Sequence, residues 1–411
     1  MLEIDYITVI SSVVLILSAL LTPLFNPFFR KPRISESATT AEEDTNISAE
    51  QNENAVSENN EEDSEPQISN SPTVIAPPIS IVFTPNDDAE TLAKNLSIYL
   101  SQDYPDYEVI VVAPQGDSET EDILKTYGNT PRLYTTFIPE SSRYMSRKKL
   151  AITLGVKAAR NEWVLMADIF CAPQSDQWLK ALARHCEDDK NLVAGYTRYE
   201  DETPDFWRFE RLHTACYLMR EDQKGKPYRC NSNALLFRKS DFNKHDGFRG
   251  NLKYLRGEFD FIVNKYSHRD SLALENSEAG TLIEPSPTHK HWLNKHLYYM
   301  ENRQHLERSA GHRFLFNLDQ MVMHLNYILI ITAACCSGFM QNWILSSAAG
   351  VALIVTLSMR MLIAKKVLTL FNEEIPVWKI IPFELRLIWQ NLNYKIKYWR
   401  ANKYDFISHK L

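Results

Sequence analysis

Patterns that would place this 411-residue chain in several common protein classes are missing from its sequence. None of its six cysteines forms a C-x-x-C pair, so we expect neither a zinc site nor a disulfide framework, and a reducing compartment fits. The net charge of −7 is modest and argues against a nucleic-acid partner. The length leaves room for one large domain and additional segments.

Residues 34–78 contain no lysine, no arginine and no aromatic residue, although they carry many glutamates and aspartates. Such a segment cannot bury enough apolar surface to offset the entropy that ordering would cost. The like charges along it favour extended conformations. The sequence therefore predicts an acidic, disordered linker over residues 34–78.

A long apolar run precedes this linker. Residues 6–25 are mostly apolar and long enough to cross a bilayer. A signal peptide is the alternative, but no basic stretch precedes the run and no small-residue cleavage site follows it. We therefore predict a transmembrane anchor within residues 1–33. The basic group at positions 30, 31 and 33 places the end of this anchor in the cytoplasm by the positive-inside rule.

Two further apolar runs, residues 321–340 and 343–362, lie near the C-terminus with a short polar turn between them. They predict a transmembrane hairpin within residues 311–366, with two buried helices of a soluble domain as the alternative. Basic residues flank both ends of the pair, so both ends are expected on the cytoplasmic side. Residues 367–411 mix tryptophan and tyrosine with lysine and arginine, which suits a helix on the membrane surface, with an ordinary packing helix as the alternative. The predicted location is the inner (cytoplasmic) membrane, with the intervening domain in the cytoplasm.

Residues 79–310 have a different texture, in which short apolar runs alternate with amphipathic segments. The alternation indicates β-α-β-α order and hence an α/β fold with a mostly parallel sheet flanked by helices. The expected strands cover residues 79–83, 108–113, 132–137 and 163–167, and the expected helices cover 88–101, 117–127, 145–160 and 205–220.

The apolar run Trp163–Ala167 is followed directly by Asp168, and Pro173 with Ser175 is expected to begin the next helix. Open α/β sheets bind ligands beyond the C-terminal ends of their strands, so Asp168 is a candidate site residue. The alternative is that Asp168 only caps a turn.

Several segments, taken in order, resemble the inverting family 2 glycosyltransferases of the GT-A fold, in particular the bacterial membrane-attached members. The matching segments are ISIVFTPNDDAE (79–90), QDYPDYEVIVV (102–112), RKKLAITLGVKAA (147–159), WVLMADIFCAP (163–173), CNSNALLFRKSDF (230–242), GEFDFIVN (257–264) and HWLNKH (291–296). Each segment alone is a weak signal, but the ordered set extends over roughly half of the chain. The resemblance implies a GT-A-like domain over residues 79–310.

The resemblance also implies roles for particular residues. Asp168 falls on the D-x-D motif and would hold a divalent metal, Mg²⁺ or Mn²⁺, through hard oxygen ligands. Asp260 or Glu258 would take the proton from the acceptor hydroxyl. The residues expected to face the nucleotide-sugar are Asn86, Asp87, Asp117, Arg147, Lys148, Lys149, Trp292 and His296.

Structural roles remain open for most of these residues. The basic residues 147–149 fit a solvated helix face equally well. The Gly-Glu-x-Asp turn at residues 257–260 is also a good start for a helix, and Asp87 is well placed to cap one. Trp292 and His296 fit packing against the membrane-proximal face as well as closure over a diphosphate.

Four residues, in three motifs, depart from the family's pattern. Phe170 stands where the second D-x-D carboxylate is expected, which puts the metal in doubt. Phe259 stands at the usual position of the catalytic base, with carboxylates on either side. Ala113 and Pro114 replace the two aspartates that usually meet the base and ribose. A phenylalanine side chain can neither bind a metal ion nor accept a proton.

Two functions follow from these observations. The first is a membrane-attached enzyme that moves a sugar from a nucleotide-sugar, with a UDP-sugar favoured, to a lipid-linked or polysaccharide acceptor of the bacterial cell envelope, with inversion. The second is a catalytically inactive, glycosyltransferase-like protein that binds ligands or serves as a scaffold beside an active enzyme.

Overall fold

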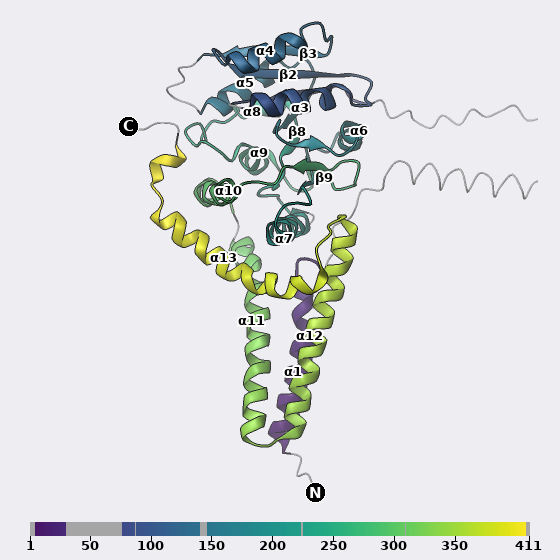
Figure 1. The fold of residues 1–411 in the computed structure, drawn as a ribbon, viewed down its shortest axis with the longest axis vertical. Coiled ribbons are helices and arrows are strands. Elements are labelled where there is room, and N and C mark those ends of the chain that lie inside the picture. Colours follow the sequence, from purple (N-terminus) through teal and green to yellow (C-terminus); the bar gives the residue numbers. More distant parts are fainter. Residues whose placement is uncertain are drawn as a thin grey trace, which may run out of the picture.

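The computed structural model describes residues 5–29, 76–86, 88–139, 146–222, 225–308 and 310–407. It shows an α/β domain at one end of a bundle of long helices (Figure 1). Nearly all of the predicted acidic linker lies outside the described residues, as do Asp87 and the basic group at positions 30, 31 and 33.

Seven strands within the described residues form the central sheet, in the order β3-β2-β1-β4-β8-β6-β9. The first four run parallel, β8 is antiparallel to both β4 and β6, and β9 is parallel to β6. The strands are β1 Ile79–Phe83, β2 Tyr107–Pro114, β3 Leu133–Ile138, β4 Trp163–Ala167, β6 Leu192–Gly195, β8 Ala234–Arg238 and β9 Leu272–Glu275. This mostly parallel sheet confirms the predicted fold class.

Helices cover both faces of the sheet, because its strands carry apolar side chains on both sides. In β1, Ile79, Ile81 and Phe83 face a core shared with α3, α4 and α6, whereas Val82 faces a core shared with α5, α8 and α9. The helices of the domain are α3 Ala89–Leu100, α4 Ser118–Thr126, α5 Arg147–Ala158, α6 Trp178–Ala183, α7 Asp205–Asp222, α8 Lys239–Lys244, α9 Glu258–Tyr266 and α10 His289–Asn302.

Helix α5 lies very close to the sheet. At Gly155 an added Cβ would come within 2.4 Å of the Val82 Cγ1 atom, so only glycine allows this approach. The Ser146 hydroxyl caps the helix by accepting a hydrogen bond from the Lys149 N–H, at 3.3 Å. This arrangement holds the first turn of α5, including Lys148, beside the C-terminal end of β4.

The prediction that Pro173 begins a helix is wrong. Ala172–Pro173 forms strand β5, which pairs antiparallel with β10 Leu282–Glu284. Together with β7 Thr197–Tyr199 these strands form a second, three-stranded sheet, and α6 begins only at Trp178. The tertiary pairing with β10, a segment far along the chain, determines this local structure.

Three helices among the described residues are long and apolar enough to cross a membrane, over Tyr6–Phe25, Asn317–Phe339 and Trp343–Leu370. They correspond to α1 Tyr6–Leu21, α11 Ala310–Phe339 and α12 Trp343–Leu370, which pack side by side with the N-terminus at the end far from the α/β domain (Figure 1). The Asn326 side chain joins the three helices, because it accepts from Ser18 Oγ at 2.8 Å and donates to Thr356 Oγ1 at 3.0 Å.

Helix α13, Ile380–Arg400, crosses between the bundle and the α/β domain (Figure 1). A buried ion-pair network fixes it to the bundle: the Arg360 guanidinium of α12 lies 2.6 Å from Glu384 of α13 and 3.1 Å from Asp319 of α11. Asn26 donates a hydrogen bond to the same Glu384, at 2.6 Å. One buried arginine therefore links three helices and the segment after α1.

Replacing Arg360 with alanine would leave two buried carboxylates, Asp319 and Glu384, without their counter-charge. We expect the free energy of unfolding to fall by about 3–5 kcal/mol, measured by denaturant unfolding of the full chain in detergent micelles. The control is Arg400→Ala at the exposed end of α13, which should change stability by less than about 0.5 kcal/mol. Equal losses in the two variants would contradict a special role for the network.

Candidate active site

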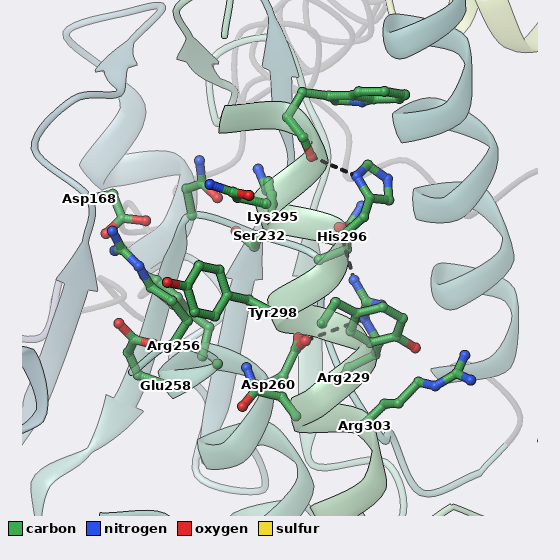
Figure 2. A pocket seen from close by; sticks show the side chains of 18 of the residues that line it. Asp168, Arg229, Ser232, Arg256, Glu258, Asp260, Lys295, His296, Tyr298 and Arg303 are labelled. Atoms are coloured by element: carbon green, nitrogen blue, oxygen red, sulfur yellow. Dashed lines mark hydrogen bonds and ion pairs between the residues drawn. The ribbon is translucent and has the colours of Figure 1, made fainter. Parts of the chain in front are cut away.

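Asp168 and the Glu258–Asp260 turn lie 90 residues apart in the sequence and meet at one cavity (Figure 2). The Lys148 ammonium joins two of these carboxylates, because its Nζ lies 2.6 Å from Asp168 Oδ1 and 3.0 Å from Glu258 Oε1. Asp168 directly follows β4, Lys148 lies in the first turn of α5, and Glu258 is the first residue of α9. Three elements thus bring their ends to a common point.

Gly257 aims the start of α9 at this point. Its φ of +91° lies in the left-handed region that favours glycine, and an added Cβ would come within 2.4 Å of the Asn302 Nδ2 atom. The backbone N–H of Asp168 is fixed in turn by a 3.0 Å hydrogen bond to the Asn233 carbonyl. Both carboxylates are therefore held by backbone constraints as well as by the lysine.

The electrostatics of the cluster keep Glu258 ionised. Burial of its carboxyl group would by itself raise the pKa, but the charges of Lys148, Lys149 and Arg256 outweigh burial and lower the pKa to about 2. Burial would by itself lower the pKa of Lys148. The negative charges of Asp168 and Glu258 outweigh burial, so the pKa of Lys148 is raised from its ordinary value. Glu258 is a fixed negative charge, poorly suited to accept a proton at neutral pH.

Lys149, although adjacent to Lys148, does not reach the cavity. Its side chain is fully buried, and its ammonium donates to the backbone carbonyls of Tyr254 and Arg256. Burial is the main cause that lowers its pKa to about 8. The expected contact of Lys149 with a nucleotide-sugar is therefore replaced by an internal role, which is to hold the loop that carries Arg256.

Asp260 also lines the cavity (Figure 2), and its carboxylate pairs with Arg229. Its Oδ2 atom lies 3.5 Å from Nε of Arg229, whose guanidinium in turn stacks over the Tyr299 ring at 3.9 Å. Within the described part of the chain, Asp260 Oδ1 has neither a hydrogen bond nor an ion pair. Asp260 thus has one positioned oxygen and one available oxygen.

The cavity has a volume of about 1120 Å³ and extends well beyond the carboxylate cluster. Its lining also includes Asn317, where a candidate membrane span begins, and Asn391 and Lys395 of α13. Lysine and arginine side chains that line it are Arg147, Lys148, Arg211, Arg229, Arg256, Lys295, Arg303, Arg308 and Lys395. Ordinary ligand pockets measure about 300–1,000 Å³, so this volume can accommodate a nucleotide-sugar together with part of a second molecule.

Trp292 and His296 line the cavity and also join the layers around it. The Trp292 ring stacks on Trp207 of α7, with centroids 4.6 Å apart, and the His296 ring stacks on Tyr394 of α13, at 4.2 Å. His296 Nε2 lies 3.2 Å from a carboxylate oxygen of Glu210. Trp292 and His296 therefore pack between α7, α10 and α13, and their contact with a diphosphate stays a prediction.

Of the other predicted donor-facing residues, Asn86 and Arg147 line the cavity. Asp117 does not: its carboxylate caps α4, where it accepts hydrogen bonds from the N–H and the hydroxyl of Thr120. Capping explains this position without a ligand, because the first N–H groups of a helix lack partners within it.

Residues 80–242 match the family described as glycosyl transferase family 2. This part of the chain therefore has the sequence pattern of that family. The mannosyltransferase PcManGT from Pyrobaculum calidifontis, in complex with GDP-Man and Mn²⁺, is similar with 13% sequence identity and a TM-score of 0.45, over 89% of this chain and 100% of that one. TarS 1–349 of S. aureus, in complex with UDP-GlcNAc, is similar with 13% identity and a TM-score of 0.39, over 72% of this chain and 90% of that one. No curated protein matches the chain.

The metal ligands expected in a family 2 glycosyltransferase do not come together in this domain. Phe170 occupies the second D-x-D position and packs against the apolar core, so Asp168 lacks its usual companion. Within the residues that the structure describes, no group of three His, Cys, Asp or Glu side chains could hold a metal ion. The cation beside Asp168 is the Lys148 ammonium, and this donor set does not fit Mg²⁺ or Mn²⁺.

Sequence reasoning missed several polar residues of the cavity. Glu284 of β10 forms buried ion pairs with Arg211 of α7 and with Lys295 of α10, the latter at 2.9 Å. Although burial would raise the pKa of Glu284, these two cations lower it to about 2. These residues come from separate segments without a shared motif. Arg256 alone carried a local signal, since it directly precedes the GEFD turn.

The low pKa of Glu258 predicts a pH dependence of stability. The pKa of Glu258 is about 2 in the folded protein and 4.5 in the unfolded chain. Ionised Glu258 therefore stabilises the folded state fully above about pH 4.5, and this stabilisation is lost as the pH falls towards 2. Glu258→Gln should therefore lose roughly 3 kcal/mol of stability at neutral pH, and the difference from wild type should shrink in acid. Thermal unfolding between pH 2.5 and 7 measures both. The exposed Glu202→Gln should follow wild type throughout, and a pH-independent Glu258→Gln difference would contradict this assignment.

Proposed function

We propose that this protein is a membrane-attached glycosyltransferase that moves a sugar from a nucleotide-sugar to an acceptor hydroxyl with inversion. One observation carries the proposal: within a chain that contains a family 2 domain, Asp168 and the Glu258–Asp260 turn face one large cavity beyond the end of β4. A carboxylate cluster at the C-terminal edge of a parallel sheet is where an α/β enzyme binds its substrate.

The reaction assigns a separate task to each charged group. The acceptor oxygen attacks the anomeric carbon from the face opposite the diphosphate, and the bond from that carbon to the diphosphate oxygen breaks. The proton of the acceptor hydroxyl passes to Oδ1 of Asp260, which acts as the general base. The electron pair of the broken bond leaves with the nucleoside diphosphate, whose charge the basic lining residues Lys148 and Arg256 stabilise.

The extent of the cavity supports an acceptor that is presented at the membrane. Its lining continues from the carboxylate cluster to Asn317 and to α13, next to the helices that are apolar enough to span a bilayer. A lipid-linked or polymeric acceptor in the cell envelope, the inner membrane as location and a cytoplasmic active site are parts of the proposal. A UDP-sugar is the first donor to test, and GDP-sugars are the second.

A catalytically inactive binding protein is the second candidate, and a specific observation favours it. Phe259 occupies the usual position of the base, where its ring centroid lies 5.8 Å from the Lys148 ammonium. Glu258 is ion-paired to Lys148, so Asp260 must supply the base if the domain is active. Binding of a nucleotide-sugar without any turnover, in the presence of membrane extract as acceptor, would establish this second function.

Asp260→Asn tests the proposed base. The amide cannot accept a proton, so we expect transfer and donor hydrolysis to fall by about 10²–10⁴-fold, with the dissociation constant of the nucleotide unchanged. Release of nucleoside diphosphate from a panel of UDP- and GDP-sugars measures turnover. Asp188→Asn, at an exposed loop position, is the matched control and should keep wild-type turnover. Full turnover in Asp260→Asn would remove Asp260 from the mechanism.

A further inference from the structure

We infer that the Lys148 ammonium takes the place of a divalent metal in this site, so that the donor diphosphate binds without Mg²⁺ or Mn²⁺. The inference rests on the proposed function. It identifies the cation that faces the diphosphate of the nucleotide-sugar. It follows from the position of Lys148, from the residues that surround it and from the charge of the group as a whole.

The Lys148 ammonium occupies the position beside Asp168 Oδ1 where a metal ion bound to that oxygen would lie. Mg²⁺ requires oxygen ligands at about 2.0–2.1 Å in near-octahedral geometry, whereas the ammonium already lies 2.6 Å from Asp168 Oδ1. An ion bound to that oxygen on the same side would meet the positive charge of Lys148 at very short range. The second carboxylate that would hold the ion has been replaced by Phe170.

Lys148 is held in place by its surroundings rather than extended into solvent. Its side chain is only 19% exposed, and its two carboxylate partners are 13% and 2% exposed. The Phe259 ring lies beside the ammonium on the helix that carries Glu258. An ammonium has three N–H donors and one donates to Asp168, so donors remain for a phosphate oxygen at the cavity that Lys148 lines.

The charges near Lys148 explain how it can serve an anionic donor. Asp168 and Glu258 together carry two negative charges, which Lys148 and Arg256 balance. Arg256 is exposed on the cavity, and its guanidinium has no hydrogen bond or ion pair within the described ranges. The Lys149 ammonium donates a hydrogen bond to the backbone carbonyl of Arg256 and so holds the loop in place. Lys148 therefore offsets one of the two carboxylate charges. Arg256 offsets the other, and its guanidinium remains exposed on the cavity, where it can contact the diphosphate.

Nucleotide binding to the full-length, detergent-solubilised protein tests this inference. Isothermal titration with UDP and with GDP is carried out in EDTA and again in Mn²⁺. We expect the dissociation constant of the bound nucleotide to agree within about twofold between the two buffers. Titration of Mn²⁺ alone into the wild-type protein should give no binding.

Lys148→Ala provides the second measurement. Loss of a charged hydrogen-bond donor should weaken nucleotide binding in EDTA by about tenfold or more. Because Asp168 and Glu258 are then unpaired, Mn²⁺ should restore part of the affinity, so the variant becomes metal-dependent. Lys157→Ala, at an exposed position of the same helix, should behave as wild type in both buffers.

Several results would overturn the inference. Wild-type protein that binds Mn²⁺, or that binds UDP or GDP only in Mn²⁺, would show that a metal supplies the counter-charge. Absence of nucleotide binding in both buffers would also exclude Lys148 as that counter-charge. These wild-type results do not depend on the folding of Lys148→Ala. Turnover that requires Mn²⁺ would overturn the inference and leave the proposed function intact. Nucleotide binding in EDTA without turnover would support the inference and contradict the proposed function.

Discussion

The ion-pair cluster of Lys148 with Asp168 and Glu258 is the interaction on which the site depends. It joins the end of a central strand to the starts of two helices, so three parts of the fold share one electrostatic contact. Removing one partner from such a buried cluster leaves an uncompensated charge, which costs far more than the net stability that the intact cluster contributes. The arrangement is therefore as much a constraint on which residues can change as a source of stability.

A second buried ion-pair network repeats this logic at the junction with the apolar helices. Arg360 faces Asp319 and Glu384, and Asn26 completes the set from the N-terminal segment. Polar groups in apolar surroundings must find partners, and here each partner comes from a different helix. The bundle is thereby fixed to α13, and α13 forms one wall of the cavity. The position of the α/β domain relative to the long helices is consequently specific.

Sequence patterns predicted the elements of the fold well and the side-chain directions poorly. The apolar runs of β1 and β4 were sufficient to locate both strands, because short buried runs between turn signals leave few alternatives. The family resemblance predicts that Asp168 and Glu258 belong to one site, and the structure places both on one cavity. The resemblance could not show which of the neighbouring residues Lys148 and Lys149 faces the cavity. Neighbours on a helix point in different directions, and the carbonyls of a loop distant in sequence hold Lys149 inside the protein. Asp117 was assigned to the site although a helix cap accounts for it.

The stacked rings of His296 and Tyr394 have a consequence for how this protein is handled. Tyr394 belongs to α13 and also donates a hydrogen bond to Glu210 of the α/β domain, at 3.0 Å. A shortened chain that ends before α11 would lack this tyrosine and expose the face of α10 that it covers. That fragment would lack one wall of the cavity, so the apolar helices and α13 have to be retained for the cavity to keep its full lining.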